Sequence, residues 1–281
     1  MNQKKTSIEL TKRIKQKTLS LGADLVGIAS PKSMEKYPEQ YQWIEKILPP
    51  PGTNAIIVAG IRIPPSVLET SKENPRIAQF STQGLYAKLT LIAHDLTLCL
   101  DELGFRGAAI PTHLPVPMVK ETQGLKAEVS HRHAAVEAGL GNLGINGLLL
   151  TPEFGPRVRL VTILTDAPLV PDKPYAERLC NDCLKCVKAC PAQAIGKDGK
   201  VNVLACAPHI LKHGLPGLVR FATEIVKADL EKKKELVRSP EFWEYWQNLN
   251  TGIFYYCFEC LRVCPIGASE ECRQVNAQAW S

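Results

Sequence analysis

The chain has 281 residues, 45% hydrophobic and 22% charged, with a net charge of +6 at pH 7. This composition is normal for a soluble globular protein with a sizeable core, in one large domain or two ordinary ones. The longest apolar runs, such as 55–61, are far too short to cross a bilayer, and the N-terminus has no apolar signal core. We therefore expect a cytoplasmic protein without a membrane partner.

Helix and strand signals alternate along the first part of the chain. Apolar spacing predicts helices over residues 7–21, 34–47, 83–103 and 130–138. Runs rich in β-branched residues predict strands over residues 23–29, 55–63, 106–110, 147–150 and 157–165. Gly22 and Gly104 are placed as C-terminal caps. The alternation favours one α/β domain, and prolines near residues 167–175 mark its end, so we expect domains over 1–170 and 171–281.

Eight of the ten cysteines lie between Cys180 and Cys264, mostly in tight spacings that suit metal chelation better than disulfides. Residues 180–191 match the bacterial ferredoxin run C-x2-C-x2-C-x3-C-P, and residues 257–265 form a shorter second motif. The pattern predicts two [4Fe–4S] clusters and one-electron transfer. Zinc is the alternative, but zinc prefers two separated cysteine pairs and four ligands in total.

In the two-cluster pattern the fourth cysteine of each motif binds the other cluster. The first cluster is then expected to bind Cys180, Cys183, Cys186 and Cys264. The second is expected to bind Cys190, Cys257, Cys260 and one further residue. Cys206 is our choice for that residue and Cys272 is the alternative. Cys99 lies at an apolar helix position, where we expect a small core residue.

A glycine-rich segment follows the helix predicted over 130–138. Gly139, Gly141 and Gly144 match the spacing G-x-G-x-x-G, and glycines there permit the close approach of a large ligand. A dinucleotide fingerprint follows a strand and opens a helix, whereas this segment follows a helix and leads into a strand. We therefore discount a dinucleotide site, and a plain helix cap and turn is the alternative.

The segments 138–150, 152–155 and 163–166, followed by the two cysteine motifs, resemble the epoxyqueuosine reductase family, which is related to the corrinoid-dependent reductive dehalogenases. The resemblance implies an α+β protein: an α/β nitroreductase-like domain that holds base-off cobalamin, then a ferredoxin-like domain with two clusters. The sequence between Cys206 and Cys257 predicts a helical insert in that second domain, at about 207–256. It implies that electrons pass through the clusters to cobalt, which reduces a substrate. Gly139, Gly141, Gly144 and Asn146 would contact the cobalamin.

The chain also departs from the family pattern. Ile145 stands where the family usually has Lys, and the segment 123–130 has no Asp where the family has its acidic proton donor. Only 17 residues follow Cys264, whereas the tRNA reductase has a helical-repeat extension there. We therefore do not expect tRNA as the substrate, and favour a smaller substrate or a protein partner.

Three residues are candidates for proton donation: His131 and His133 at the start of a helix, and Glu128 in the preceding loop. Glu121 is a further acid in that loop. The alternative is that the histidines are surface or capping residues. The aromatic residues between 242 and 256 are expected mostly in a core, and the charged run 231–238 on a solvated helix face.

The leading hypothesis is a corrinoid-dependent reductase supplied with electrons by two clusters. An electron-transfer protein that serves a partner enzyme, and a protein that reactivates a partner corrinoid protein, are the alternatives. The excess of positive charge suits an acidic electron donor such as a ferredoxin or flavodoxin, although ordinary surface charge is the favoured explanation.

Overall fold

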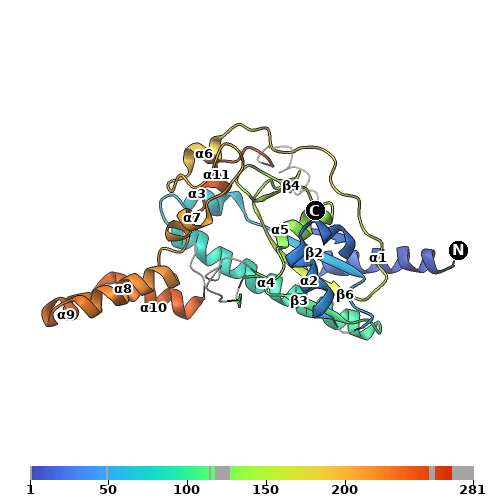
Figure 1. Ribbon diagram of the computed structural model, residues 1–281, viewed down its shortest axis with the longest axis horizontal. Coiled ribbons are helices and arrows are strands. Elements are labelled where there is room, and N and C mark those ends of the chain that lie inside the picture. Colours follow the sequence, from blue (N-terminus) through green and yellow to red (C-terminus); the bar gives the residue numbers. More distant parts are fainter. Residues whose placement is uncertain (1, 49, 114, 118–126, 253–256, 268–281) are drawn as a thin grey trace. The chain divides into compact units, whose positions relative to one another are not determined.

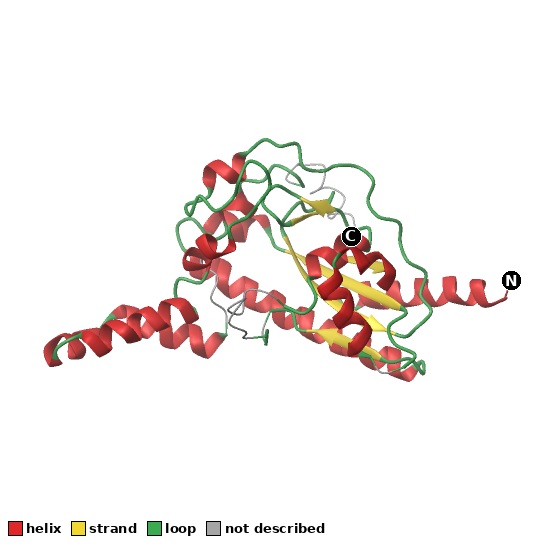
Figure 2. Cartoon of the chain, in the orientation of Figure 1, coloured by secondary structure: helices red, strands yellow, loops and turns green. Residues whose placement is uncertain are grey.

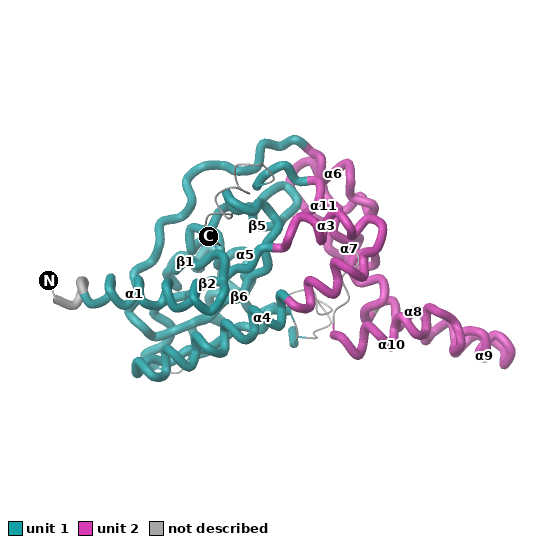
Figure 3. The backbone as a smooth tube through the Cα atoms, turned by 180° about the vertical axis from the view of Figure 1, so that it is seen from behind, with its two compact units in different colours: residues 1–62, 85–183, 264–281 teal, residues 63–84, 184–263 magenta. Residues whose placement is uncertain are grey.

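The computed structural model describes residues 2–48, 50–113, 115–117, 127–252 and 257–267. The chain divides into two compact units (Figure 3). Unit 1 comprises residues 1–62, 85–183 and 264–281, and unit 2 comprises residues 63–84 and 184–263. The boundary between domains 1–170 and 171–281 stays a prediction. No helix in the part of the chain that the structure describes is long and apolar enough to cross a membrane.

Unit 1 is built on a four-stranded sheet in the order β1 (Leu25–Ala29), β2 (Ala55–Arg62), β6 (Val158–Thr165) and β3 (Gly107–Ile110), drawn as yellow arrows in Figure 2. β2 and β6 pair along their whole lengths and are almost entirely buried, which explains their near-continuous apolar sequences. All three strand pairs are antiparallel. The predicted alternation of helices and strands is present, but an α/β domain normally has parallel strands.

The helices of unit 1 pack their apolar faces on this sheet. They are α1 (Asn2–Ser20), the short 3-10 helix η1 (Pro31–Lys36), α2 (Pro38–Ile47), the larger part of α4 (Pro75–Glu102) and α5 (His131–Glu137). Ile44 of α2 and Ala134 of α5 lie in one core cluster with Ile56 and Leu164 of the sheet. A small hairpin of β4 (Asn142–Leu143) and β5 (Leu149–Leu150) follows α5.

Two helix predictions needed correction. The helix expected over 34–47 is divided into η1 and α2, because Pro38 fits the first turn of a new helix better than the interior of one. α4 begins at Pro75, eight residues before the predicted start. Gly22 and Gly104 have positive φ angles after α1 and α4, as expected of C-terminal caps. Cys99 on α4 is partly exposed and is not a core residue.

Unit 2 is helical, as expected for the insert. Its helices are α3 (Pro65–Thr70), the start of α4, α6 (Lys185–Ala189), α7 (Val203–Ile210), α8 (Leu215–Lys227), α9 (Leu230–Arg238), α10 (Pro240–Thr251) and α11 (Glu259–Arg262) (Figure 1). The side chains of Asp229 and Ser239 cap α9 and α10. Phe221, Leu236 and Tyr245 form a small core among α8, α9 and α10.

The aromatic residues of α10 are less buried than the sequence suggested. Tyr245 is buried, whereas Trp243 and Trp246 are 53% and 55% exposed, so the expectation of a mostly buried set is wrong for the described residues. The run 231–238 does lie on a solvated face of α9, where Lys232 pairs with Glu235 and Lys234 with Glu231. Phe254, Tyr255 and Tyr256 lie outside the described residues.

Candidate functional site

Four cysteines of unit 2 lie together, and we call them the second thiol group: Cys190, Cys206, Cys257 and Cys260. Cys190 ends α6, Cys206 lies in α7 and Cys260 lies in α11, which packs on α6. Burial raises the pKa of the Cys260 thiol to about 12. Further rises in that pKa come from the nearby thiols of Cys257, Cys206, Cys186 and Cys190. Cys260 is therefore within electrostatic range of all the other members.

A short hairpin brings Cys206 to Cys190. Ile195 and Val201 form an isolated β-bridge, and the N–H of Asn202 donates to the carbonyl of Ala194 at 2.8 Å. The side chain of Asn202 then caps α7 by accepting from the N–H of Ala205. The chain thus reverses direction after Cys190 and starts α7 beside it. This contact places Cys206, the residue chosen from the sequence, near Cys190, and Cys257 is also within electrostatic range of it.

Backbone N–H groups point at the sulfurs of this group. The N–H of Ala194 donates to Sγ of Cys190 at 3.3 Å. Burial raises the pKa of Cys257, whereas a hydrogen bond from the backbone of Glu259 lowers it. Such bonds favour the thiolate form, which is the form that binds iron.

Three cysteines of unit 1 form the first thiol group: Cys180, Cys183 and Cys264. Burial raises the pKa of Cys264, and the thiols of Cys183 and Cys180 add to the rise. The backbone of Ile266 and the Arg157 guanidinium act in the opposite direction on the pKa of Cys264. Cys183 is exposed, so this group is more accessible to solvent than the second one.

Arg157, which sequence reasoning missed, holds the second Cys-Pro turn. It is 5% exposed, and its two terminal nitrogens donate to the carbonyls of Cys264 (3.0 Å) and Ile266 (2.9 Å). Gly155 and Gly267 have positive φ angles, and a Cβ on Gly155 would collide with the carbonyl oxygen of Ile266. The Pro152–Gly155 motif of the sequence is therefore part of the support for Cys264.

The segment before Cys180 is also fixed to unit 1. Asn142 in β4 donates through Nδ2 to the carbonyl of Glu177 at 2.6 Å and accepts through Oδ1 from the N–H of Leu179 at 3.1 Å. Arg178 forms two hydrogen bonds with Asp182, at 2.6 and 2.7 Å. These contacts orient the loop that presents Cys180 and Cys183.

The donor set fits an iron–sulfur cluster better than a single ion. No three His, Cys, Asp or Glu side chains within the described ranges are close enough to hold one metal ion. A four-iron cluster has its own irons and sulfides between its ligands and needs thiolates around it. Both groups supply thiols alone. Cys272, the alternative ligand, lies outside the described residues.

The glycines of the segment 139–147 face the chain's own atoms. A Cβ on Gly139 would collide with the carbonyl oxygen of Lys173, and one on Gly141 with that of Leu150. A Cβ on Gly144 would lie 2.9 Å from Oδ1 of Asn146. Asn146 is 6% exposed and accepts a hydrogen bond from the N–H of Leu148 at 3.2 Å. Internal packing accounts for these four residues, and their contact with a cofactor stays a prediction.

The ring of His131 has two internal partners. Nε2 donates to the carbonyl of Pro111 at 2.9 Å, because a carbonyl oxygen only accepts, and Nδ1 lies 2.8 Å from the hydroxyl of Thr162. Burial lowers the pKa of His131, against the opposing effect of the Pro111 hydrogen bond. The neutral His131 ring thus links α5 to β6 and to the segment after β3.

His133 also contacts neighbouring elements. Gln40 donates to its Nδ1 at 2.8 Å, and the ring of Tyr37 stacks on it at 4.2 Å. Burial and the charge of Arg132 lower the pKa of His133. Glu137, a buried acid that we did not predict, lies on the same helix and pairs with Lys36 at 2.9 Å.

Glu128 is partly buried just before α5. Glu121 lies outside the described residues. Glu128 has no partner among the described residues that links it to the two thiol groups. The choice of proton donor among His131, His133 and Glu128 therefore stays a prediction.

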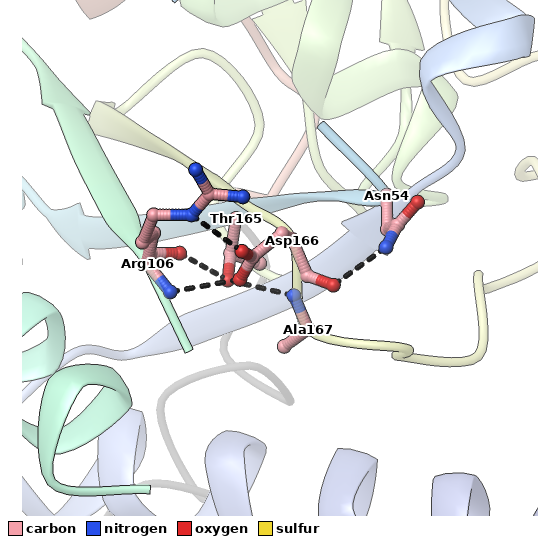
Figure 4. A network of polar contacts seen from close by, with 5 residues as sticks. All are labelled: Asn54, Arg106, Thr165, Asp166 and Ala167. Atoms are coloured by element: carbon pink, nitrogen blue, oxygen red, sulfur yellow. Dashed lines mark hydrogen bonds and ion pairs between the residues drawn. The ribbon is translucent and has the colours of Figure 1, made fainter. Parts of the chain in front are cut away.

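The motif 163–166 ends β6 in a polar network (Figure 4). Asp166 accepts from the backbone N–H and from Nε of Arg106, both at 2.7 Å, and Asn54 donates to the Asp166 carbonyl at 2.6 Å. The hydroxyl of Thr165 donates to the Arg106 carbonyl at 2.7 Å. This network ties β6 to the starts of β2 and β3. Its role is structural.

No family model matches the chain. The tetrachloroethene reductive dehalogenase of Dehalobacter restrictus is 33% identical over 242 residues, which cover 69% of this chain and 40% of that protein. The epoxyqueuosine reductase of Bacillus cereus is 28% identical over 265 residues, covering 88% of this chain and 61% of that one. The chain thus spans less than two thirds of either relative.

Solved structures show the same likeness of fold. A reductive dehalogenase, described as suggesting a mechanism for B12-dependent dehalogenation, matches with a TM-score of 0.61 at 20% identity, over 95% of this chain and 33% of that one. A selenomethionine-labelled epoxyqueuosine reductase matches with a TM-score of 0.54 at 19% identity, over 93% and 66%. The resemblance expected from the motifs is confirmed: this chain is a relative of the reductive dehalogenases and the epoxyqueuosine reductases.

Proposed function

We propose that the chain is a reductase that binds two [4Fe–4S] clusters and passes single electrons through them to a base-off cobalamin, which reduces a small substrate. The observation that supports this most directly is the gathering of thiols into two groups, each supported by backbone hydrogen bonds. The clusters would supply one-electron transfer, and cobalamin would supply the metal centre at which substrate is reduced.

We assign the thiols to the two clusters by the spacing of the cysteines along the chain. The second cluster would be held by Cys190, Cys206, Cys257 and Cys260. The first would be held by Cys180, Cys183 and Cys264, with Cys186 as the fourth ligand. Cys186 is 8% exposed on α6, three residues after Cys183. Burial of Cys186 limits the contact of its sulfur with water. N–H donors would stabilise the thiolates of Cys190 and Cys257, and the charge of Arg157 that of Cys264.

Support for cobalamin comes from the relatives, one of which is described as B12-dependent. The residues that the resemblance assigns to it, Gly139, Gly141, Gly144 and Asn146, all have internal contacts in unit 1. We therefore derive no step of the reaction through the corrin. We also propose that the first domain is nitroreductase-like and that the second is ferredoxin-like.

The substrate is proposed to be a small molecule. One relative has been solved with a tRNA stem loop, and it shares 20% identity with this chain, which is a likeness of fold alone. Ile145 and the lack of an Asp in residues 123–130 distinguish this chain from the family pattern. We keep tRNA outside the proposal.

Anaerobic reconstitution with iron, sulfide and cobalamin tests the proposal. We expect about eight irons per chain, four for each cluster, and a bound-corrin absorption band that survives gel filtration. Zinc in place of iron would contradict the cluster assignment. Intact clusters without retained corrin would instead indicate an electron-transfer protein. Bound corrin without turnover of any halogenated or epoxide substrate, under a strong reductant, would indicate a reactivating protein.

A further inference from the structure

We propose that residues 184–206 form a docking surface for an acidic one-electron carrier protein. This inference rests on the proposed function, because it concerns the delivery of electrons to the clusters. The exposed side chains that define the surface are Lys185, Lys188, Lys197, Lys200, Val203 and Leu204.

This segment carries an excess of positive charge close to the cysteines of unit 2. Residues 184–206 contain four lysines and one aspartate, so 23 residues hold a net charge of +3 out of +6 for the whole chain. Lys200 lies 3.6 Å from Asp198, and this pair is largely solvated, with the lysine 89% exposed. Lys185, Lys188 and Lys197 have no ion pair with any residue that the structure describes. Their charge is therefore available to a partner.

α6 places two of the exposed lysines close to two proposed cluster ligands. Lys185 and Lys188 are three residues apart and so lie on one side of the helix, where both are exposed. Cys186, between them in sequence, is buried, and Cys190 ends the same helix. An α-helix is about 10–12 Å across with its side chains, so a partner on the lysine side would stand roughly that far from these sulfurs.

Apolar residues lie in the same segment. Val203 and Leu204, at the start of α7, are 48% and 66% exposed, and Cys206 follows two residues later. Complexes of electron carriers are small and transient, and complementary charge steers their encounter. A few exposed apolar side chains with lysines nearby fit such a contact.

The other basic run of unit 2 lacks these properties. Lys232 and Lys234 on α9 pair with Glu235 and Glu231 of the same helix, at 2.8 and 2.7 Å. Their charge is neutralised locally, and no cysteine lies in α9. α9 therefore offers a control of matched residue type.

In the proposed step the carrier loses one electron and a cluster gains it, with no bond made or broken.

The test uses the reconstituted protein and a plant-type [2Fe–2S] ferredoxin as the acidic carrier. The variant Lys185→Glu/Lys188→Glu is compared with the control Lys232→Glu/Lys233→Glu. We expect the affinity for ferredoxin, measured by calorimetry at low salt, to fall by about tenfold or more in the first variant only. We also expect the wild-type affinity to fall as salt rises. Electron resonance would follow the electron from the two-iron donor to the four-iron clusters.

Dithionite separates the two proposals, because it is a small reductant that needs no docking surface. Both variants should keep their iron and be reduced by dithionite as the wild type is. If dithionite reduces the clusters but the first variant binds ferredoxin like the control, or the wild type does not bind it at all, the docking surface is wrong. If no four-iron signal appears in the wild type, the proposed function itself fails.

Discussion

The two thiol groups are assembled in different ways. In the second group, short helices and a hairpin bring four cysteines from α6, α7 and α11 together, and burial raises the pKa of Cys260 to about 12. In the first group, an irregular loop presents Cys180 and Cys183, and a buried arginine fixes the turn of Cys264. Packing between helices of unit 2 thus assembles one group, whereas the other depends on hydrogen bonds from a buried arginine of unit 1 to an irregular turn.

The difference also concerns access. Cys183 is exposed, whereas Cys186 is buried and the members of the second group are partly buried. If the first cluster receives electrons from outside, exposure at that position is useful. The second group is then suited to an inner position. The predictions below test how independent the two groups are.

The largest effect is expected from removing one ligand of each group. Cys260→Ser and Cys264→Ser should each lower the iron content from about eight to about four per chain, because each abolishes one cubane. Electron resonance should show that different clusters are lost in the two variants. Cys99→Ser, on α4, is the control and should keep both. Two intact clusters in Cys264→Ser would refute the crossed ligation.

The choice of the fourth ligand of the second cluster can be made in the same assay. Cys206→Ser should lose the second cluster, because Cys206 is within electrostatic range of Cys257 and Cys190. Cys272→Ser should behave like the wild type. The reverse result would transfer the ligand assignment to Cys272.

Arg157→Lys should weaken the binding of the first cluster without abolishing it, and leave the second cluster intact. Lysine keeps the charge but loses the fork that binds two carbonyls at once, so the turn of Cys264 loses a fixed position. Substitutions of such supporting residues typically weaken metal binding by about 10–100-fold. We expect that loss for the first cluster alone, measured by iron release to a chelator. Arg238→Lys on exposed α9 is the control, and equal loss of both clusters would contradict the contrast drawn above.

A substitution away from both groups should cost stability without emptying either site. Asp166→Asn removes the charge that accepts two hydrogen bonds from Arg106. We expect a loss of about 1–3 kcal/mol in the free energy of unfolding, measured in urea. Asp95→Asn, on the exposed side of α4, is the control. Loss of iron at low urea in Asp166→Asn would mean that the first group depends on the whole sheet.

The smallest effect concerns pH. Burial holds the folded-state pKa of His131 below its ordinary 6.5, so the unfolded chain takes up a proton first on acidification. The contribution of the neutral His131 ring to the free energy of unfolding is complete above pH 6.5. It is lost as the pH drops from there through the folded-state pKa. His131→Gln should make the urea midpoint less sensitive between pH 7.5 and 5.5. An unchanged pH slope together with abolished turnover would instead identify His131 as a proton donor.

Much of this protein could be predicted from short-range pattern. The helices, the buried strands and the caps at Gly22 and Gly104 follow from residues within one or two turns of each other. The thiols follow from spacing, because ferredoxin loops hold ligands that are two or three residues apart. Cys206 followed from the shortage of cysteines in the second motif, and it lies within electrostatic range of Cys257 and Cys190, although its role as a ligand stays a prediction.

Tertiary structure alone decided what joins distant segments. The antiparallel order β1-β2-β6-β3 is invisible in an alternating pattern, which parallel strands would satisfy as well. The hydrogen bond from Arg157 to the Cys264 carbonyl joins residues 107 positions apart. The carbonyl oxygens of Lys173 and Leu150 leave no room for a Cβ at Gly139 and Gly141. Spacing along the chain encodes local geometry, whereas these contacts depend on which distant segments the folded backbone brings together. The sequence by itself therefore indicated the candidate ligands, and only the fold showed which contacts support them.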